Sequence, residues 1–295
     1  MATLEKAKKR APGNKALFTT FTLSDKEFEI IRVLVKEKTG ISLGLHKRDL
    51  VVSRLSRRLR ALGLSSFKDY INHLKNKDDG DELVQMINRI TTNKTDFFRE
   101  KHHFEYLTNI LLPQLYQEGE KTGKRELRVW SAGCSSGEEP YTLAMTMSDF
   151  FKDHPNWRFK ILATDLDTTI LTKASQGEYD EALLNPVPKA FKARYFARRR
   201  TPDGIIYKAK PELRNLIMFR KFNLMSPSYS LKVTLDFIFC RNVMIYFDTA
   251  DKTSMMEKFH KLLRPGGHVF VGHSESLMMV KHLFKYVATT TYVKV

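Results

Sequence analysis

The spacing of apolar residues changes once along the chain, and this change limits the folds that the sequence can adopt. Before residue 127 the apolar residues recur at helical spacing, and no strand-like run occurs. Beyond it, short apolar runs alternate with helical segments, and the runs at 127–131, 159–164 and 235–240 predict buried strands. Strands that alternate with helices indicate βαβ units around a parallel sheet. Residues 127–295 are therefore expected to form an α/β domain.

The first part of the chain reads as a basic tail followed by a small helical domain. Residues 1–22 are polar and basic without a sustained period, which predicts a flexible tail. Ser24, with Glu27 three residues later, forms a capping box that predicts the start of the first helix. Further helices are expected over residues 46–61, 66–75 and 81–91. These elements give an all-helical N-terminal domain over residues 23–91, and residues 92–126 form a linker and a connecting helix.

The helix expected over residues 46–61 has a strongly basic surface. Its apolar residues form one stripe, which leaves Arg57 and Arg60 on the opposite face. Arg54 and Arg58 lie along the flanks of the stripe. A basic helix of this kind attracts an acidic partner and speeds its association, so these arginines are candidates for binding an acidic protein surface. The alternative is that they form only the solvated face of an amphipathic helix.

Residues 180–215 interrupt the alternation of strands and helices. Two runs with strand character, 193–197 and 205–209, flank a Thr-Pro-Asp-Gly sequence at residues 201–204, which is typical of a turn. Two strands joined in this way form an antiparallel hairpin. We therefore expect a small antiparallel β-subdomain inserted into the α/β domain.

The charge and cysteine content exclude several classes of protein. The 50 Lys and Arg residues against 33 Asp and Glu residues give a net charge of +17, which indicates an acidic partner without identifying it. Two cysteines are too few for a disulfide framework, and the N-terminus lacks the apolar core of a secretory signal. No apolar run approaches the roughly 18 residues that a membrane span needs. The expected location is the cytoplasm.

A turn of small residues follows the first predicted strand. Residues 129–140 read VWSAGCSSGEEP, so that Gly133 lies in the turn and Glu138 and Glu139 follow it. Small residues let a cofactor approach the backbone at the carboxyl edge of a parallel sheet. The two carboxylates would repel a dinucleotide pyrophosphate but tolerate a cofactor with a cationic amino-acid tail and a neutral ribose. The alternative is a close-packed turn with capping glutamates.

Polar residues also follow the second predicted strand and the apolar run at residues 216–219. Asp165 ends the second strand, where it can accept hydrogen bonds from the two hydroxyls of a ribose, whereas Asp167 is placed to cap the next helix. Asn223 can donate to and accept from an adenine edge, and Leu224 adds backbone groups and an apolar face. The alternative for Asn223 is an asparagine turn.

The strand predicted at residues 235–240 runs directly into Arg241 and Asn242, and Tyr246 follows a few residues later. These side chains are more polar than a buried run requires, and functional groups concentrate at the ends of such strands. They are therefore candidates for lining a ligand pocket. An ordinary solvated strand exit is the alternative.

Five sequence motifs, taken in order, resemble one known family. They are TTNKTDFFRE at residues 91–100, WSAGCSSGEEPY at 130–141, ATDLD at 163–167, FCRNVMIYF at 239–247 and PGGHVFVGHSES at 265–276. Behind a helical N-terminal domain, they resemble the CheR family, the S-adenosylmethionine-dependent protein-glutamate methyltransferases of bacterial chemotaxis. The resemblance covers residues 23–295. It implies a Rossmann-like methyltransferase domain with the inserted antiparallel β-subdomain, preceded by the all-α domain.

The resemblance also implies a cofactor site for S-adenosylmethionine. It assigns to this site residues of the linker and of the strand ends: Asn93, Thr95, Arg99, Glu139, Asp165, Asn223, Leu224, Arg241 and Asn242. The linker residues would reach the methionine end of the cofactor, with Glu139 nearby. Asp165 would bind the ribose, and Asn223 and Leu224 would lie at the adenine. Arg241 and Asn242 would close the pocket.

In the reaction that the resemblance implies, a glutamate carboxylate of a receptor attacks the sulfonium methyl group. The products are a glutamate methyl ester and S-adenosylhomocysteine. A glutamate with a reference pKa of about 4.3 is ionised at neutral pH, so no general base is required. Arg99 is the candidate for holding the cofactor carboxylate or the incoming glutamate, and Tyr246 for orienting the acceptor.

The implied partners are the glutamate-rich cytoplasmic helical bundles of membrane chemoreceptors, which suit the arginine-rich helix. In some family members the β-subdomain also binds a C-terminal receptor peptide as an added strand, and residues 189–221 are strongly basic here. The arginine triplet at residues 198–200 can equally protect an edge strand from aggregation. Neither nucleic acid nor direct membrane insertion is expected.

Two other functions stay open on the sequence. A non-catalytic S-adenosylmethionine-binding signalling module would keep the cofactor residues and lose the substrate side. A nucleic-acid methyltransferase would explain the positive charge, but residues 240–243 read CRNV and not an Asn/Asp-Pro-Pro-aromatic motif. No metal is expected, because the nine histidines, His102 and His103 included, show no ligand cluster with matching cysteine or carboxylate spacing.

Overall fold

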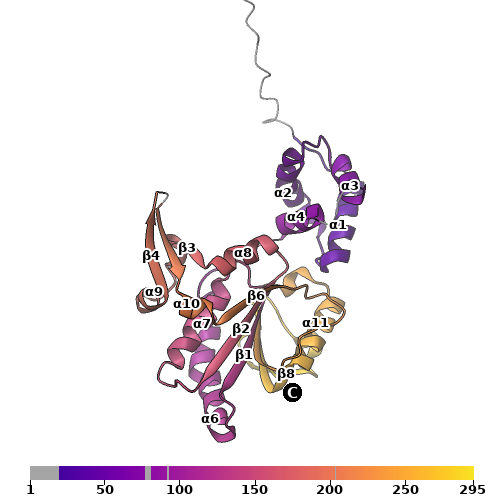
Figure 1. The fold of residues 1–295 in the computed structure, drawn as a ribbon. Coiled ribbons are helices and arrows are strands. Elements are labelled where there is room, and N and C mark those ends of the chain that lie inside the picture. The colour runs from indigo at the N-terminus through magenta and orange to yellow at the C-terminus, as the bar shows by residue number, and fades with distance from the viewer. Residues whose placement is uncertain (1–19, 77–80, 92, 203) are drawn as a thin grey trace, which may run out of the picture. The chain divides into compact units, whose positions relative to one another are not determined.

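The computed structural model describes residues 20–76, 81–91, 93–202 and 204–295, and these fall into two compact units (Figure 1). The first unit contains the described parts of residues 1–33 and 44–90. The second unit contains residues 34–43 and the described part of 91–295. The predicted basic tail lies outside the described residues except for its last few positions.

The first unit is helical, as the sequence predicts. Its helices are α1 (Asp25–Thr39, which continues into the second unit), the 3-10 turn η2 (Leu45–Lys47), α2 (Arg48–Ala61), α3 (Phe67–Asn76) and α4 (Asp81–Ile90). The capping box is confirmed, because the Ser24 N–H donates to the Glu27 carboxylate at 2.7 Å and the Glu27 N–H donates to Ser24 Oγ at 3.3 Å. The apolar stripe of α2 is buried, and α2 packs against α4.

The last part of α1 groups with the second unit, which the sequence does not predict. Lys36, in this part, forms ion pairs with Asp248 at 2.6 Å and with Asp251. Gly40 ends the helix with a φ of +76°, and a Cβ there would lie 2.0 Å from Cγ of Met225. Residues 34–43 are therefore held by the α/β unit, although the sequence assigns all of residues 23–91 to one helical domain.

The second unit is built on a seven-stranded sheet with the order β6-β2-β1-β7-β8-β10-β9. Its strands are β1 (Glu126–Ala132), β2 (Arg158–Asp165), β6 (Ile217–Lys221), β7 (Leu235–Cys240), β8 (Leu263–Val271), β9 (Phe284–Ala288) and β10 (Thr291–Lys294). The strands from β6 to β8 are parallel, and β10 and β9 add to this sheet in antiparallel fashion. The α/β fold class is therefore confirmed.

Helices precede and connect these strands. They are α5 (Lys101–Tyr106), the π-helical turn η3 (Leu107–Leu111), α6 (Leu112–Thr122), α7 (Glu138–Phe150), α8 (Thr168–Gln176), η5 (Met244–Tyr246), α11 (Thr249–Leu262) and η6 (Met278–Val280). Within the described ranges, none of the helices has the length and apolar composition of a membrane-spanning segment.

Strand β7 shows how both faces of the sheet are buried. Every residue of β7 is buried, and its side chains alternate between two hydrophobic clusters. Phe237 and Phe239 belong to the cluster that includes residues of α5, α6 and α7. Ile238 and Cys240 belong to the cluster that includes residues of α11. Burial on both faces is typical of parallel sheets covered by helices, and it explains the continuous apolar run in the sequence.

The inserted subdomain is a second, three-stranded antiparallel sheet with the order β3-β5-β4. Its elements are β3 (Glu178–Asp180), η4 (Glu181–Leu184), α9 (Lys189–Tyr195), β4 (Phe196–Thr201), β5 (Gly204–Ala209) and α10 (Pro211–Arg214). The predicted hairpin is present, but its first strand begins at Phe196 because residues 193–195 belong to α9. Strand β3 was not predicted, since three residues are too short for a clear alternation.

Candidate cofactor-binding and catalytic site

The turn after β1 is fixed to the end of β2. The backbone N–H groups of Gly133 and Cys134 both donate to the carbonyl oxygen of Thr164 at 2.8 Å. Gly133 has a φ of +82°, and a Cβ there would lie 2.4 Å from a methyl carbon of Val243. Glycine is therefore required both by the backbone conformation and by the close approach of the segment after β7.

Asp165 lies half-buried at the end of β2 and faces this turn. Its Oδ2 accepts a hydrogen bond from the Ser135 N–H at 2.8 Å, and its Oδ1 accepts one from the Asp167 N–H at 3.0 Å. Burial raises the pKa of the Asp165 carboxyl, although these backbone hydrogen bonds oppose the shift. Asp167 caps α8 by accepting from the N–H groups of Thr169 and Ile170, which confirms the capping role expected for it, and the ribose role of Asp165 stays a prediction.

The linker before α5 lies beside these two turns. The Asn93 side chain donates from Nδ2 to Asp167 Oδ2 at 3.0 Å, and Ser135 Oγ donates to the Asn93 carbonyl at 3.1 Å. Thr95 is half-buried in the same segment. Arg99 donates from Nη1 to the Lys94 carbonyl at 2.8 Å, so the linker folds back on itself.

Arg241 and Glu139 form a buried ion pair below the turn. Arg241 Nε donates to Glu139 Oε2 at 2.8 Å, and Ser131 Oγ donates to Glu139 Oε1 at 2.6 Å. Both members of the pair are only 7% exposed. The neighbouring Glu138 instead accepts from the Ser136 hydroxyl at 2.7 Å, and burial raises its pKa. The structure thus separates the roles of the two glutamates, which the sequence alone could not do.

The guanidinium of Arg241 also holds the linker. Its Nη1 donates to the backbone carbonyl of Arg99, and its Cζ lies 5.4 and 5.5 Å from the ring centroids of Phe104 and Phe239. One side chain therefore connects the end of β7, the start of α7 through Glu139, and the linker.

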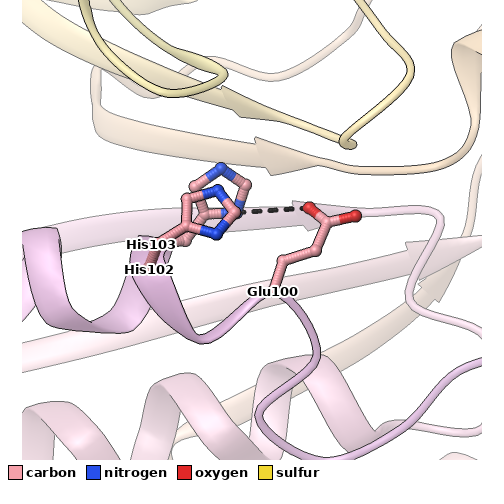
Figure 2. A group of neighbouring side chains, drawn as sticks. All are labelled: Glu100, His102 and His103. Carbon is pink, nitrogen blue, oxygen red and sulfur yellow. Dashed lines mark ion pairs between the residues drawn. The ribbon is translucent and has the colours of Figure 1, made fainter.

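Glu100, His102 and His103 gather next to this guanidinium (Figure 2), and their candidate ligand atoms lie within 4.8 Å of one another. Arg241 Nη1 lies 3.3 Å from His103 Nδ1 and 3.6 Å from Glu100 Oε2. Burial and the charge of Arg241 lower the pKa of His103 to about 3, so its ring is neutral at pH 7. Because a guanidinium only donates, Nδ1 is the acceptor and Nε2 carries the proton, which reaches Thr290 Oγ1 at 2.7 Å.

The arrangement of these donors bears on metal binding. The sequence reading did not pick out Glu100 as a neighbour of the two histidines. A divalent cation held by Glu100 and His103 Nδ1 would share these atoms with the Arg241 guanidinium, and the two positive charges would repel each other. The cluster therefore fits a resident arginine better than a metal ion.

Asn242 and Tyr246 lie in the segment that follows β7. Asn242 has a φ of +59°, and its Nδ2 lies 3.3 Å from the acceptor Glu100 Oε1. Tyr246 ends the short helix η5 and is half-buried, and its carbonyl accepts from the Ser42 N–H at 2.8 Å. At the start of this segment, the Asn242 N–H donates to the carboxylate of Glu275, which is buried. The sequence analysis did not select Glu275 as a site residue, because it belongs to a different motif.

Asn223 forms the asparagine turn that the sequence left as an alternative. Its Oδ1 accepts from the Met225 N–H at 2.9 Å, and its Nδ2 donates to the Lys38 carbonyl at 3.0 Å. The preceding Phe222 N–H donates to the Asp165 carbonyl at 3.0 Å, which places Asn223 near the end of β2. Leu224 is buried and belongs to the cluster on the α11 face of the sheet. The amide of Asn223 keeps a second N–H and a second lone pair, so a role toward adenine stays a prediction.

The four arginines of α2 do not share one environment. Arg54 donates to the Ile90 carbonyl at 2.7 Å, at the end of α4. Arg58 forms an ion pair with Glu82, which is 6% exposed. Arg57 and Arg60 are exposed, and the Arg60 guanidinium lies 5.6 Å from the ring centroid of Phe21. Two of these arginines therefore stabilise the helical unit, and two present their charge to solvent.

Comparison with known proteins identifies the family of the chain. Residues 26–91 match the CheR methyltransferase all-alpha domain, and residues 93–293 match the CheR methyltransferase SAM-binding domain. The chain belongs to the CheR methyltransferase family. This result confirms the resemblance and the predicted order of a helical and a methyltransferase domain.

Curated relatives from several bacteria agree with this assignment. The chain is 42% identical over 274 residues to chemotaxis protein methyltransferase 2 of Pseudomonas aeruginosa, covering 92% of this chain and 94% of the relative. It is 41% identical over 271 residues to the chemotaxis protein methyltransferase of Escherichia coli, covering 92% and 91%. It is 38% identical over 262 residues to that of Borreliella burgdorferi, covering 88% and 91%.

Among the residues that the sequence assigned to the site, the structure joins several directly. Hydrogen bonds link Arg99, Arg241 and Glu139 in one chain, and Asn93 reaches the Asp165 region through Ser135 and Asp167. Asp165 and Arg241 lie at the carboxyl ends of the parallel strands β2 and β7, where α/β folds bind their ligands, and the linker residues bond to groups at this edge. The arginines of α2 belong to the other unit and are not part of this arrangement.

Proposed function

We propose that this chain transfers the methyl group of S-adenosylmethionine to glutamate side chains of membrane chemoreceptors. Family membership over both domains and the name shared by the relatives support this function. The structural observation that carries it is the chain of hydrogen bonds from Arg99 through Arg241 to Glu139. It fixes the linker beside the turn of Gly133, where the family places its cofactor.

The donor set fits this cofactor. Asp165 offers a half-buried carboxylate at the end of β2, which suits the paired hydroxyls of a ribose. Asn223 and Leu224, after β6, are the proposed adenine contacts. Asn93, Thr95 and Arg99 are the proposed contacts at the methionine end. Since Glu139 and Arg241 are already paired with each other, we propose that they and Asn242 shape this end of the pocket by holding the linker.

The cofactor, when bound, supplies a methyl group that is activated by a sulfonium. In the transfer, a carboxylate oxygen of the substrate forms a bond to the methyl carbon, and the carbon–sulfur bond breaks with its electrons going to sulfur. No proton moves, because the glutamate is already ionised at neutral pH. The protein contributes alignment and the exclusion of water. We propose that Arg99 holds the cofactor carboxylate or the incoming glutamate and that Tyr246 orients the acceptor oxygen.

Turnover at saturating substrates tests these two roles. Arg99→Ala and Tyr246→Phe should each lower kcat by at least about tenfold, the size of effect expected when alignment is lost. Arg220→Ala, at an exposed position of β6, is the matched control for a lost guanidinium and should retain wild-type kcat. Wild-type turnover in both Arg99→Ala and Tyr246→Phe would contradict the assignment.

Two surfaces are proposed for the receptor. Arg57 and Arg60 are exposed and can attract the glutamate-rich helices, whereas Arg54 and Arg58 contribute mainly by holding α2 in its unit. The second surface is β4, which lies at one end of the subdomain sheet and can accept a receptor C-terminal peptide as an added strand. A peptide of the receptor C-terminus should lose affinity when a proline replaces a residue of β4, and unchanged affinity would exclude this surface.

The reaction itself is tested with labelled S-adenosylmethionine and membranes that contain the receptors of the same cell. Label on the receptor that mild alkali releases as methanol supports a glutamate methyl ester. Label that resists alkali, or that appears on nucleic acid, contradicts the glutamate substrate. Cofactor binding without any transfer would instead support a non-catalytic signalling module.

A further inference from the structure

Glu275 is a buried carboxylate that reaches the segment after β7 from the segment after β8. Its Oε2 accepts hydrogen bonds from the backbone N–H groups of Gly272 and, at 2.9 Å, Asn242. Its Oε1 accepts from the Ile245 N–H at 3.3 Å. Glu275 is 7% exposed, and no ion pair involves it among the residues that the structure describes. Backbone dipoles therefore stabilise its charge, and they all belong to two short segments.

The two segments approach each other without room for a side chain. A Cβ on Gly272 would lie 2.4 Å from Asn242 Nδ2, 2.6 Å from the Asn242 backbone nitrogen and 2.8 Å from Glu275 Oε2. The carboxylate of Glu275 lies at this point of contact. Glu275 Oε2 therefore holds the two segments together, because it accepts one backbone hydrogen bond from each of them.

The backbone of Asn242 needs such support. Its φ of +59° lies in the left-handed region, which asparagine adopts more readily than other non-glycine residues but which is still less favoured than the extended region, so its surroundings select it. The Asn242 N–H bond to Glu275 acts directly on this residue. Without it, the segment can relax toward an extended backbone, which would redirect every side chain up to Tyr246.

The segment is also held at its far end. The Tyr246 carbonyl accepts from the Ser42 N–H at 2.8 Å. Glu275 thus fixes residues 242 and 245, and Ser42 fixes residue 246. Glu275 is the only one of these supports that is a side chain and can be changed without altering the backbone.

We infer that Glu275 is a positioning residue for methyl transfer, which sets the backbone of residues 242–246 and through it the position of the Tyr246 hydroxyl. The inference rests on the proposed role of Tyr246. It extends that role to a residue that touches neither cofactor nor substrate. Catalytic alignment is sensitive to displacements of about 1 Å, so a small change in this segment has a large effect on rate.

The substitution Glu275→Gln keeps the shape of the side chain and changes its hydrogen bonding. One oxygen becomes an amide NH2 group, which cannot accept from a backbone N–H. Glutamine can keep the two bonds of Oε2 and lose only the longer bond to Ile245. Glu275→Ala removes all of them and serves as the stronger variant. Glu257→Gln, at an exposed position of α11, is the matched control.

A double-mutant cycle tests the inference in the full-length protein. Glu275→Gln, which can keep the bond to Asn242, should lower kcat less than Glu275→Ala does. We expect Glu275→Ala to lower kcat by about tenfold or more while KM for the cofactor changes by less than about threefold. In the Tyr246→Phe background the same substitution should change kcat by less than about threefold, because the hydroxyl that it displaces is absent. Equal losses in both backgrounds would overturn the inference. Wild-type kcat in Tyr246→Phe alone would instead overturn the proposed role of Tyr246, and the inference with it.

A spectroscopic measurement keeps the inference testable if the variants turn over poorly. Fluorotyrosine incorporated at Tyr246 should show a changed 19F resonance in Glu275→Gln and Glu275→Ala but not in Glu257→Gln. An unchanged resonance in both Glu275 variants, with the fold intact by circular dichroism, would overturn the inference. A general loss of stability would lower the melting temperature without this local change.

Discussion

Arg241 and Glu139 are 102 residues apart in the sequence, and yet Nε of the arginine lies 2.8 Å from Oε2 of the glutamate in a buried ion pair. The pair joins the end of β7 to the start of α7. Arg241 also donates to the Arg99 carbonyl, so the pair determines where the linker lies. Its disruption should therefore change both stability and cofactor binding.

Replacement of Glu139 by alanine should destabilise the protein by about 3–5 kcal/mol, because it leaves a buried guanidinium without its main partner. Urea unfolding measures this change, and titration calorimetry should show weakened S-adenosylmethionine binding. The control is Glu126→Ala, which breaks the exposed pair with Arg128 and should cost less than about 1 kcal/mol. Equal effects of the two substitutions would show that the buried pair has no special role.

The pKa of His103 predicts a specific pH dependence of stability. Its folded-state pKa of about 3 lies below the ordinary value of 6.5, so the unfolded state binds more protons between these values. Stability from this group is therefore present above about pH 6.5 and is lost as the pH falls. Between pH 7.5 and 5.5 the loss should be about 1.4 kcal/mol.

The variant His103→Asn isolates this contribution, since Asn Oδ1 can accept from Arg241 but does not titrate. Urea unfolding at both pH values should show that the wild type loses about 1.4 kcal/mol more than the variant. Other titrating groups are common to the two proteins and cancel in this difference. Parallel stability curves would mean that His103 is not buried in its neutral form.

Asp165→Asn should weaken binding of both S-adenosylmethionine and S-adenosylhomocysteine by about 10- to 100-fold. The ribose is common to the two ligands, and a hydrogen bond to a charged acceptor contributes about 1.5–3 kcal/mol. Calorimetric titration with each ligand measures the effect. Asp153→Asn, on the surface after α7, should bind both ligands like the wild type. Weakened binding of only one ligand would place Asp165 away from the ribose.

Charge reversal of the exposed arginines tests the receptor surface. The double variant Arg57→Glu and Arg60→Glu should methylate receptors several-fold more slowly at low receptor concentration, and added salt should narrow the difference from the wild type. Its melting temperature should stay close to that of the wild type. The double variant Lys121→Glu and Lys261→Glu, at exposed positions of α6 and α11, makes the same change in net charge and is the control. An equal loss in the control would indicate a general charge effect without a docking surface.

Arg58→Gln should behave in the opposite way. It removes the partner of the buried Glu82 carboxylate, so we expect lower stability, measured by urea unfolding. The receptor methylation rate per folded molecule should stay near that of the wild type. A rate loss without a stability loss would assign Arg58 to the docking surface after all.

Local patterns in the sequence were sufficient to predict the elements and the fold class. The capping box of Ser24 and Glu27 and the helix cap of Asp167 depend on residues only a few positions apart, and both occur in the structure. The apolar run at residues 235–240 predicted a strand, and β7 occurs there. By contrast, the helix over residues 189–195 was read in part as a strand, because a short segment beside a turn carries little periodicity.

The partners of the site residues could not be predicted, because they come from distant segments. The sequence marked Arg241 and Glu139 as polar groups at strand ends, but nothing in it shows that they neutralise each other. It also placed Arg54 and Arg58 on the flanks of α2, where only the fold reveals Ile90 and Glu82 as their partners. The role of Glu275 could not be predicted from the sequence either, because its hydrogen-bond donors are backbone N–H groups, which every residue except proline has.

The assignment of residues 34–43 to the α/β unit affects how such a protein can be divided or recombined. The boundary between the two family domains falls near residue 92. Lys36 and Ser42 lie before this boundary, but Lys36 forms an ion pair with Asp248, and the Ser42 N–H donates to the Tyr246 carbonyl. A chimera that exchanges the helical domain between relatives would need to keep the end of α1 with its original methyltransferase.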